Sequence, residues 1–144
     1  MFDHQISRFE KRIADLPDQP TLAPDALKAW FDSAPEQLRQ ALEDVDSADF
    51  TVLLAHRPEL LAKYAQFPLD LVVSGHAHGG QVRIPGVLNG LYAPNQGWFP
   101  KLAGGAYTQD GTTLIVSRGL AVRTRLPRIF NRPEVVLVRC VPEE

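Results

Sequence analysis

The sequence predicts an α/β fold, on three observations. Short apolar runs at 50–55 and 71–73 are typical of buried strands, and the stretch between them is predicted to be helical, which together make a βαβ unit with parallel strands. All ten glycines lie between Gly75 and Gly119, which indicates a second half built from strands and tight turns. The first 48 residues contain no glycine and space their apolar side chains as helices do. We therefore expect a single domain over 1–144, with a helical segment at 1–48 and an α/β part with a β-rich tail at 49–144.

The helical segment is predicted to hold three short helices. Apolar residues recur at three- and four-residue steps over 6–16, which describes one face of an amphipathic helix. Pro24 can open a second helix and Pro35 a third, because proline is well accepted in the first turn. Residues 1–50 carry 11 acidic and 5 basic side chains. We find no motif that points to chemistry in this segment.

The α/β part is divided by its turn residues. A helix is predicted over 59–67, between the two apolar runs. The alternation of polar and apolar residues at 81–84 favours an edge strand, and further strands are predicted at 112–117 and 134–141. Asn-Gly at 89–90 and Asp-Gly at 110–111 are hairpin-turn signals.

Composition excludes several classes of protein. With 44% hydrophobic and 22% charged residues in 144, the chain can bury a core and is not a disordered segment. A formal net charge of −2 argues against a dedicated nucleic-acid binder. The single Cys140 excludes an internal disulfide and a cysteine-based zinc cage. No apolar run approaches the ~20 residues of a membrane span and no apolar leader follows Met1, so we expect a cytoplasmic or membrane-peripheral location.

Three histidines directly follow the predicted buried strands. His56 ends the first apolar run, and His76 and His78 follow the second, with Gly75 and 79–80 around them. Ligands bind most often at the carboxyl ends of strands in α/β sheets, and neutral imidazole is a common ligand of zinc, manganese and iron. These residues are therefore candidate metal ligands, with ordinary polar turn residues as the alternative. Two acidic residues, Glu59 and Asp70, lie near the histidines in the sequence. Each is at the end of a predicted element, so a capping role or a surface position explains it without metal binding.

Arginines gather towards the C-terminus, where six lie between Arg118 and Arg139. Two interpretations are open. They can form a solvated edge of the molecule. They can also attract an anionic substrate, because the planar guanidinium group pairs with phosphate or carboxylate.

The strings at 56–59 (His-Arg-Pro-Glu) and 74–81 (Ser-Gly-His-Ala-His-Gly-Gly-Gln) closely resemble the C-terminal half of bacterial calcineurin-like metallophosphoesterases. Ser-Arg-Gly-Leu at 117–120 and Arg-Pro-Glu-Val at 132–135 resemble the closing segments of the branch related to phosphodiesterases of lipid-linked nucleotides and the cell envelope. The match runs from about residue 50 to 140. It implies the C-terminal half of an α/β/β/α sandwich with two divalent metal ions held at strand ends.

The resemblance also implies roles for individual residues. His56 and His76 would bind the second metal and His78 the first, and Arg118 is a candidate for substrate binding. The substrate would be a phosphate ester, lipid-linked in this branch. The identity of the ions, manganese, zinc or iron, stays open.

The chain departs from the family pattern in its other ligands. The upstream Asp-x-His, the Gly-Asp-x-x-Asp with the bridging acid and the Gly-Asn-His-Asp/Glu do not occur in it. We favour a fragment or truncated gene model that is inactive alone, with its natural N-terminus missing. A split protein and a degenerate paralogue are the other readings. The alternative function is a non-catalytic metal-binding or assembly module. A half-domain of this kind would expose a sheet edge and associate through it.

Overall fold

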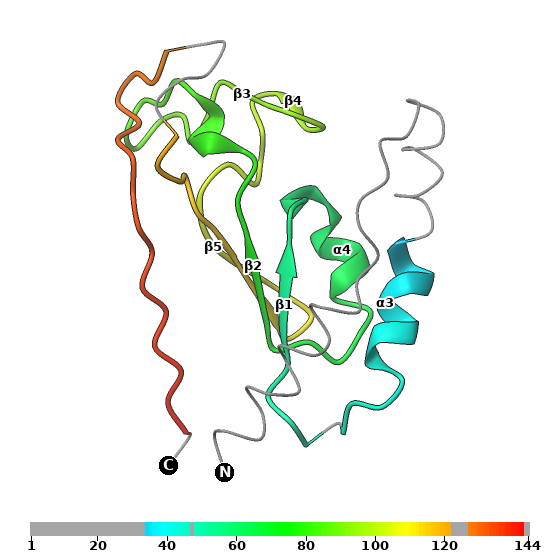
Figure 1. Cartoon of the computed structure of the whole chain (residues 1–144). Helices are drawn as coiled ribbons and strands as arrows, with labels where there is room; N and C mark the ends of the chain where they lie inside the picture. The colour runs from blue at the N-terminus through cyan, green and yellow to red at the C-terminus, as the bar shows by residue number, and fades with distance from the viewer. Residues whose placement is uncertain (1–33, 47, 122–126, 143–144) are drawn as a thin grey trace. The chain divides into compact units, whose positions relative to one another are not determined.

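A computed structural model describes residues 34–46, 48–121 and 127–142 (Figure 1). The chain divides into two compact units, 1–46 and 47–144. In the first unit, helix α3 (Ala34–Leu42) begins one residue before Pro35, where a helix start is predicted, and Arg39 pairs with Glu36 one turn earlier at 2.5 Å. The helices predicted before residue 33 lie outside the described residues, as do His4, Arg123 and Arg125.

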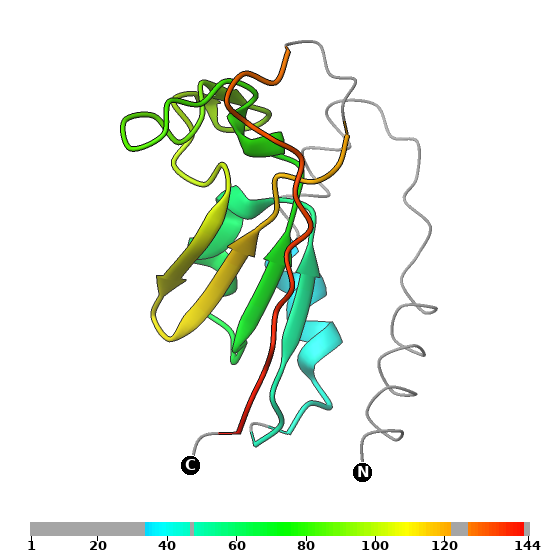
Figure 2. The same ribbon diagram turned by 90° about the vertical axis from the view of Figure 1, so that its left-hand side faces the viewer.

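The second unit is built on a four-stranded mixed sheet in the order β1-β2-β6-β5, whose strands lie side by side in Figure 2. Its strands are β1 (Val52–Ala55), β2 (Leu71–Ser74), β5 (Gly105–Gln109) and β6 (Thr112–Val116). Strand β2 pairs in parallel with β1 and β6, whereas β5 runs antiparallel to β6. This arrangement confirms the predicted α/β class and the parallel βαβ unit.

The apolar pattern of the central strands explains their positions. Val72 in β2 and Leu114 and Val116 in β6 are completely buried. Leu54 in β1, a strand at the edge of this sheet, is 58% exposed, so the burial predicted for this run is not found at that position. The connection from β1 to β2 contains a 3₁₀ turn η1 (Pro58–Leu60) and a single-turn helix α4 (Leu61–Tyr64). This helix is shorter than the predicted 59–67, because the first part of that range forms the 3₁₀ turn η1 and residues 65–67 form a turn.

Asp70 lies at the end of the sheet where β1 and β2 begin. Its carboxylate accepts a hydrogen bond from the main-chain N–H of Thr51 at 2.7 Å. Nearby, the hydroxyl of Thr112 donates to the carbonyl of Leu69 at 2.8 Å. These bonds tie the starts of three strands together, so the role of Asp70 is structural.

One of the two predicted hairpin turns is present. Asp110 and Gly111 join β5 to β6 with φ angles of 49° and 87°, and Gln109 faces Thr112 across the turn. Positive φ at both positions is what a two-residue hairpin loop requires. The hairpin turn predicted at Asn89–Gly90 is wrong. The chain turns instead at 85–87, and the residues on either side of this turn, Ile84 and Leu88, form an antiparallel bridge.

Two predicted strands do not form within the described part of the chain. At 81–84, Val82 and Ile84 make only isolated bridges, with Ile129 and Leu88. At 134–141 the backbone has no strand assignment, and Leu137 is 93% exposed. The β-forming residues are there, but a strand becomes part of a sheet only when a neighbouring backbone supplies hydrogen bonds. A small antiparallel pair, β3 (Tyr92–Ala93) with β4 (Gly97–Trp98), was not predicted.

Candidate metal site

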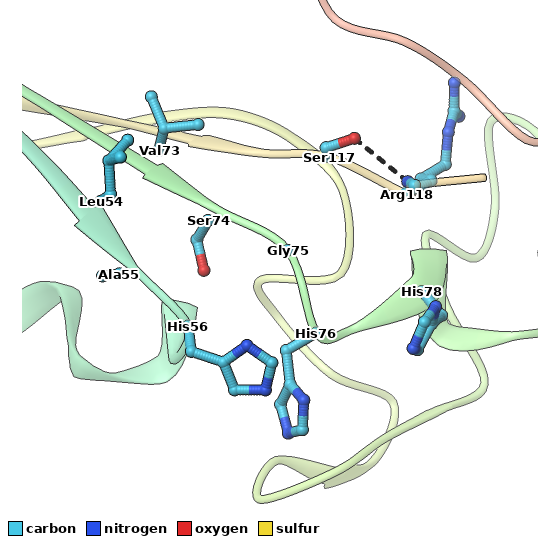
Figure 3. A pocket seen from close by; sticks show the side chains of 11 residues that line it. Leu54, Ala55, His56, Val73, Ser74, Gly75, His76, His78, Ser117 and Arg118 are labelled. Carbon is cyan, nitrogen blue, oxygen red and sulfur yellow. Dashed lines mark hydrogen bonds between the residues drawn. The ribbon is translucent and has the colours of Figure 1, made fainter. Parts of the chain in front are cut away.

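The ends of three strands meet around one open hollow of about 470 Å³. His56 directly follows β1, and His76 and His78 follow β2 after a short turn. The segment 117–119 follows β6 and lines the same hollow. The three candidate ligands are therefore neighbours at one edge of the sheet, as Figure 3 shows.

The histidines are not arranged as a single cluster. The rings of His56 and His76 lie side by side, with centroids 4.2 Å apart and planes tilted by 50°. The ring of His78 stands apart from this pair in Figure 3. Among the residues that the structure describes, no group of three or more histidine, cysteine, aspartate or glutamate side chains is placed to hold one metal ion. The structure thus brings together two of the three candidate ligands and puts the third elsewhere along the same hollow.

The backbone that carries these histidines is unusual. His76 and His78 have φ angles of 65° and 47°, in the left-handed region that costs a non-glycine residue energy. Such conformations persist when surrounding contacts fix them, and they often mark functional sites. Here the turn is closed by main-chain bonds from Ala77 to Gly75 and from Gly80 to Ala77, both 2.8 Å.

Asn131 is a further part of the site that the sequence did not reveal. Its side chain is 2% exposed, and its Nδ2 donates to the carbonyls of His78 at 2.7 Å and Gln81 at 3.1 Å. The residue lies just before the 132–135 string, yet no local pattern connects it to the histidines. Only the folded chain brings these segments together.

Asn95 is a second residue that the sequence did not reveal. It comes from the turn between β3 and β4, and its Nδ2 lies 3.1 Å from Nε2 of His76. The Pro-Asn-Gln-Gly sequence at 94–97 signals a turn but gives no indication of what the turn would reach.

Burial shapes the charge of the histidines. Burial of the ring, followed by the proximity of His56, lowers the pKa of His76 below the ordinary 6.5, against a smaller opposing effect of Glu59. Burial, followed by the proximity of Arg128, lowers the pKa of His78. Both imidazoles are therefore neutral at pH 7 and keep a ring nitrogen lone pair, which metal binding requires.

Glu59 is the carboxylate whose charge acts on this site. Nε of Arg57 donates to its Oε1 at 2.5 Å, while Oε2 is buried and has no hydrogen-bond partner among the described residues. Burial, and then the charge of Glu59, raise the pKa of Tyr64 to about 12. The sequence suggested a capping or surface role for Glu59, whereas the structure places it part-buried within electrostatic reach of His76.

Arg118 lines the hollow, but its guanidinium group is engaged elsewhere. It forms an ion pair with Glu134, and its main-chain N–H donates to the same carboxylate at 2.9 Å. In Figure 3 the side chain turns away from the three histidines. Arg128 supports this segment by donating to the carbonyls of Arg118 and Ala121, both at 2.7 Å. Two of the six arginines thus hold the chain after β6 in place.

Comparison with known proteins identifies relatives of this part of the chain. A Bacillus subtilis protein named uncharacterized metallophosphoesterase YkuE is 36% identical over 91 residues, which cover 61% of this chain and 30% of the relative. UDP-2,3-diacylglucosamine pyrophosphatases LpxG of Chlamydia muridarum and Chlamydia trachomatis are 33% and 30% identical over 103 and 116 residues, covering 64% and 73% of this chain. No family model and no solved structure matches the chain.

These relatives confirm the resemblance to bacterial metallophosphoesterases. The chain spans about a third of the length of the curated relatives that it matches. No helix within the described ranges is long and apolar enough to cross a membrane.

Proposed function

We propose that this chain supplies metal ligands and part of the substrate hollow to a phosphoesterase that hydrolyses phosphomonoesters or phosphodiesters at a two-metal centre. His56 and His76 hold one divalent ion and His78 holds the other. The observation that carries the proposal is the pair of rings 4.2 Å apart at the carboxyl ends of two parallel strands. Relatives named metallophosphoesterases support it.

The chemistry of the site fits this proposal in part. Two imidazoles side by side suit zinc, manganese or iron, and a third candidate ligand set apart from them suits a second ion. Two-metal centres hold their ions ~3.5–4 Å apart, and carboxylates offset the charge. Glu59, the acid whose charge acts on His76, is paired with Arg57. We therefore propose that the remaining acidic ligands come from outside these 144 residues.

When bound, the ions would polarise the phosphoryl group and lower the pKa of a bound water. The chain's own residues would supply the geometry. Asn131 holds the turn that presents His78, and the pairing of Arg118 with Glu134 fixes the part of the wall of the hollow that follows β6. In the proposed substrate-binding role, Arg118 exchanges its carboxylate partner for the phosphate group. The LpxG relatives support a lipid-linked phosphate ester as the substrate class.

A turnover assay tests the proposal. The 144-residue chain with zinc or manganese should hydrolyse bis-p-nitrophenyl phosphate no faster than the metal in buffer. The same chain extended by the coding sequence immediately upstream should hydrolyse it, and His56→Ala or His76→Ala should abolish this turnover. Upstream sequence with no in-frame Asp-x-His and Gly-Asn-His, or an extended chain whose turnover survives both substitutions, would contradict the proposal.

A second candidate is a non-catalytic metal-binding module. It is favoured by the lack of a three-ligand group among the described residues, because such a module would hold one ion or none. The extended chain separates the two candidates, since a module would remain inactive.

A further inference from the structure

The turn between β3 and β4 delivers one side chain to the candidate metal site. Nδ2 of Asn95 and Nε2 of His76 are 3.1 Å apart, a hydrogen-bond distance. Asn95 has a φ of 61°, so the backbone at both ends of this contact adopts the left-handed conformation. The contact therefore joins two residues with positive φ, Asn95 and His76, next to the ring of His56.

The turn that carries Asn95 is anchored on both sides. The side chain of the adjacent Gln96 both donates to and accepts from the main chain of Leu102, with each distance 3.0 Å. The rings of Tyr92 and Trp98 pack edge to face across the two strands, with centroids 5.6 Å apart. Because the turn is held in this way, the Asn95 amide has little freedom to move away from the histidine.

This contact determines which ring nitrogen of His76 can meet an ion. An imidazole has two ring nitrogens, and Nε2 is the one that faces Asn95. Histidines that bind metals usually donate the N–H of their other nitrogen to an oxygen, which fixes the tautomer and the ring orientation. An asparagine amide can provide that oxygen by a half-turn of its side chain, which exchanges Oδ1 and Nδ2 in nearly the same space.

We propose that Asn95 is a positioning residue for His76. Its Oδ1 accepts the Nε2–H of the ring, which leaves Nδ1 as the atom that His76 offers to an ion. The inference rests on the proposed metal-binding function of His76. It adds to that function the positioning residue Asn95, the ligating atom Nδ1 and the Nε2–H tautomer of the ring. Nothing in the His-x-His motif itself identifies Asn95, because 19 positions separate the two residues.

The tautomer of His76 tests the inference directly. Long-range ¹H–¹⁵N NMR on the metal-free chain distinguishes Nε2–H from Nδ1–H, and His76→Asn assigns the signal. We expect Nε2–H in the wild type and in Asn95→Asp, because an aspartate can only accept the ring proton. In Asn95→Gly, which tolerates the positive φ, the preference should be lost. Lys101→Gly, in the loop that follows β4, is the control for a general increase in backbone freedom and should leave the tautomer unchanged.

Metal affinity gives a second readout. With zinc as the probe, Asn95→Gly should weaken binding by ~10–100-fold, whereas Asn95→Asp should restore it to within about threefold of the wild type. An identical tautomer mixture in wild type and Asn95→Gly, or Nδ1–H in both, would overturn the inference. If the tautomer depends on Asn95 but neither this chain nor the chain extended by the upstream coding sequence binds zinc, the positioning contact stands and the proposed metal site is wrong.

Discussion

The side-chain amide of Asn131 donates to the main-chain carbonyl of His78 at 2.7 Å, although 53 positions separate the two residues in the sequence. The same amide reaches the carbonyl of Gln81 at 3.1 Å. One buried side chain therefore spans the turn that carries two of the three candidate ligands. The shape of the histidine turn depends on the segment that follows β6.

Replacing Asn131 should destabilise the fold and loosen the histidine turn. Asn131→Ala removes both donors and leaves two carbonyls without them, which should lower the free energy of unfolding by about 1–3 kcal/mol. Urea denaturation would measure this loss. Gln109→Ala, near the β5–β6 turn, is the control and should change stability by less than about 0.5 kcal/mol. If the two substitutions lower the free energy of unfolding equally, the hydrogen bonds of Asn131 do not stabilise the fold more than a surface residue does.

Gly79→Ala should be more damaging than Gly86→Ala. Both glycines have positive φ, 64° and 77°, so both substitutions carry a backbone cost of about 1–2 kcal/mol. A Cβ at Gly79 would also lie 2.2 Å from Oδ1 of Asn131, whereas one at Gly86 would meet nothing within 4 Å. The difference between the unfolding free energies of the two variants measures the cost of the steric overlap with Asn131. If both variants lose the same stability, the close approach of Asn131 to the turn is wrong.

Acidification should weaken the metal-free chain before most carboxylates titrate. The folded pKa values of His76 and His78 lie below the ordinary 6.5, so the unfolded chain takes up these protons first. Their contribution is absent at pH 7.5, where both states are neutral, and becomes destabilising as pH falls through about 6.5. We expect a lower urea midpoint at pH 5.5 than at 7.5, and a smaller difference in His76→Asn. A midpoint that rises on acidification would contradict this sign.

The isolated chain should bind at most one zinc or manganese ion, and weakly. The His56–His76 pair offers two imidazoles, and the described residues contain no group of three or more potential ligands with acids that would offset two close cations. Isothermal titration at pH 7.5 would measure stoichiometry and affinity. Replacing any two of His56, His76 and His78 with alanine should abolish binding, which should also weaken below about pH 6. Two tightly bound ions per chain would mean that this sequence holds ligands that we have not identified.

The C-terminal segment should promote self-association. Over 135–141 the described backbone forms no sheet, and Val135 and Leu137 are 80% and 93% exposed. Unpaired β-forming segments tend to pair with another copy. Light scattering after size exclusion should show a mass that rises with concentration, and Leu137→Lys should reduce it. Val87→Lys, an 83% exposed apolar residue on the 85–87 turn, is the matched control. A monomer at all concentrations would contradict this expectation.

Much of the second unit could be predicted from local patterns. The runs at 50–55 and 71–73 contain the parallel strands β1 and β2, because their β-branched and apolar side chains favour strand backbone. Only β2 is buried inside the sheet, whereas β1 lies at its edge. The Asp110–Gly111 turn was predictable because two consecutive positive φ angles demand such residues. The unpaired state of the 134–141 segment could not be predicted. Its β-forming residues show that it is suited to a sheet, but not whether a partner strand is present.

Local sequence patterns were enough to predict the α/β class, the strands that precede the histidines and the family resemblance, since each follows from residues close together in the chain. The assembly of the site depends instead on contacts that form when the chain folds. Folding placed His56 against His76, set His78 apart, turned Arg118 towards Glu134 and brought Asn95 and Asn131 to the histidine turn. Such contacts join residues 16 to 53 positions apart, and no local periodicity encodes them, because they exist only once the strands have paired and their ends meet at one edge of the sheet.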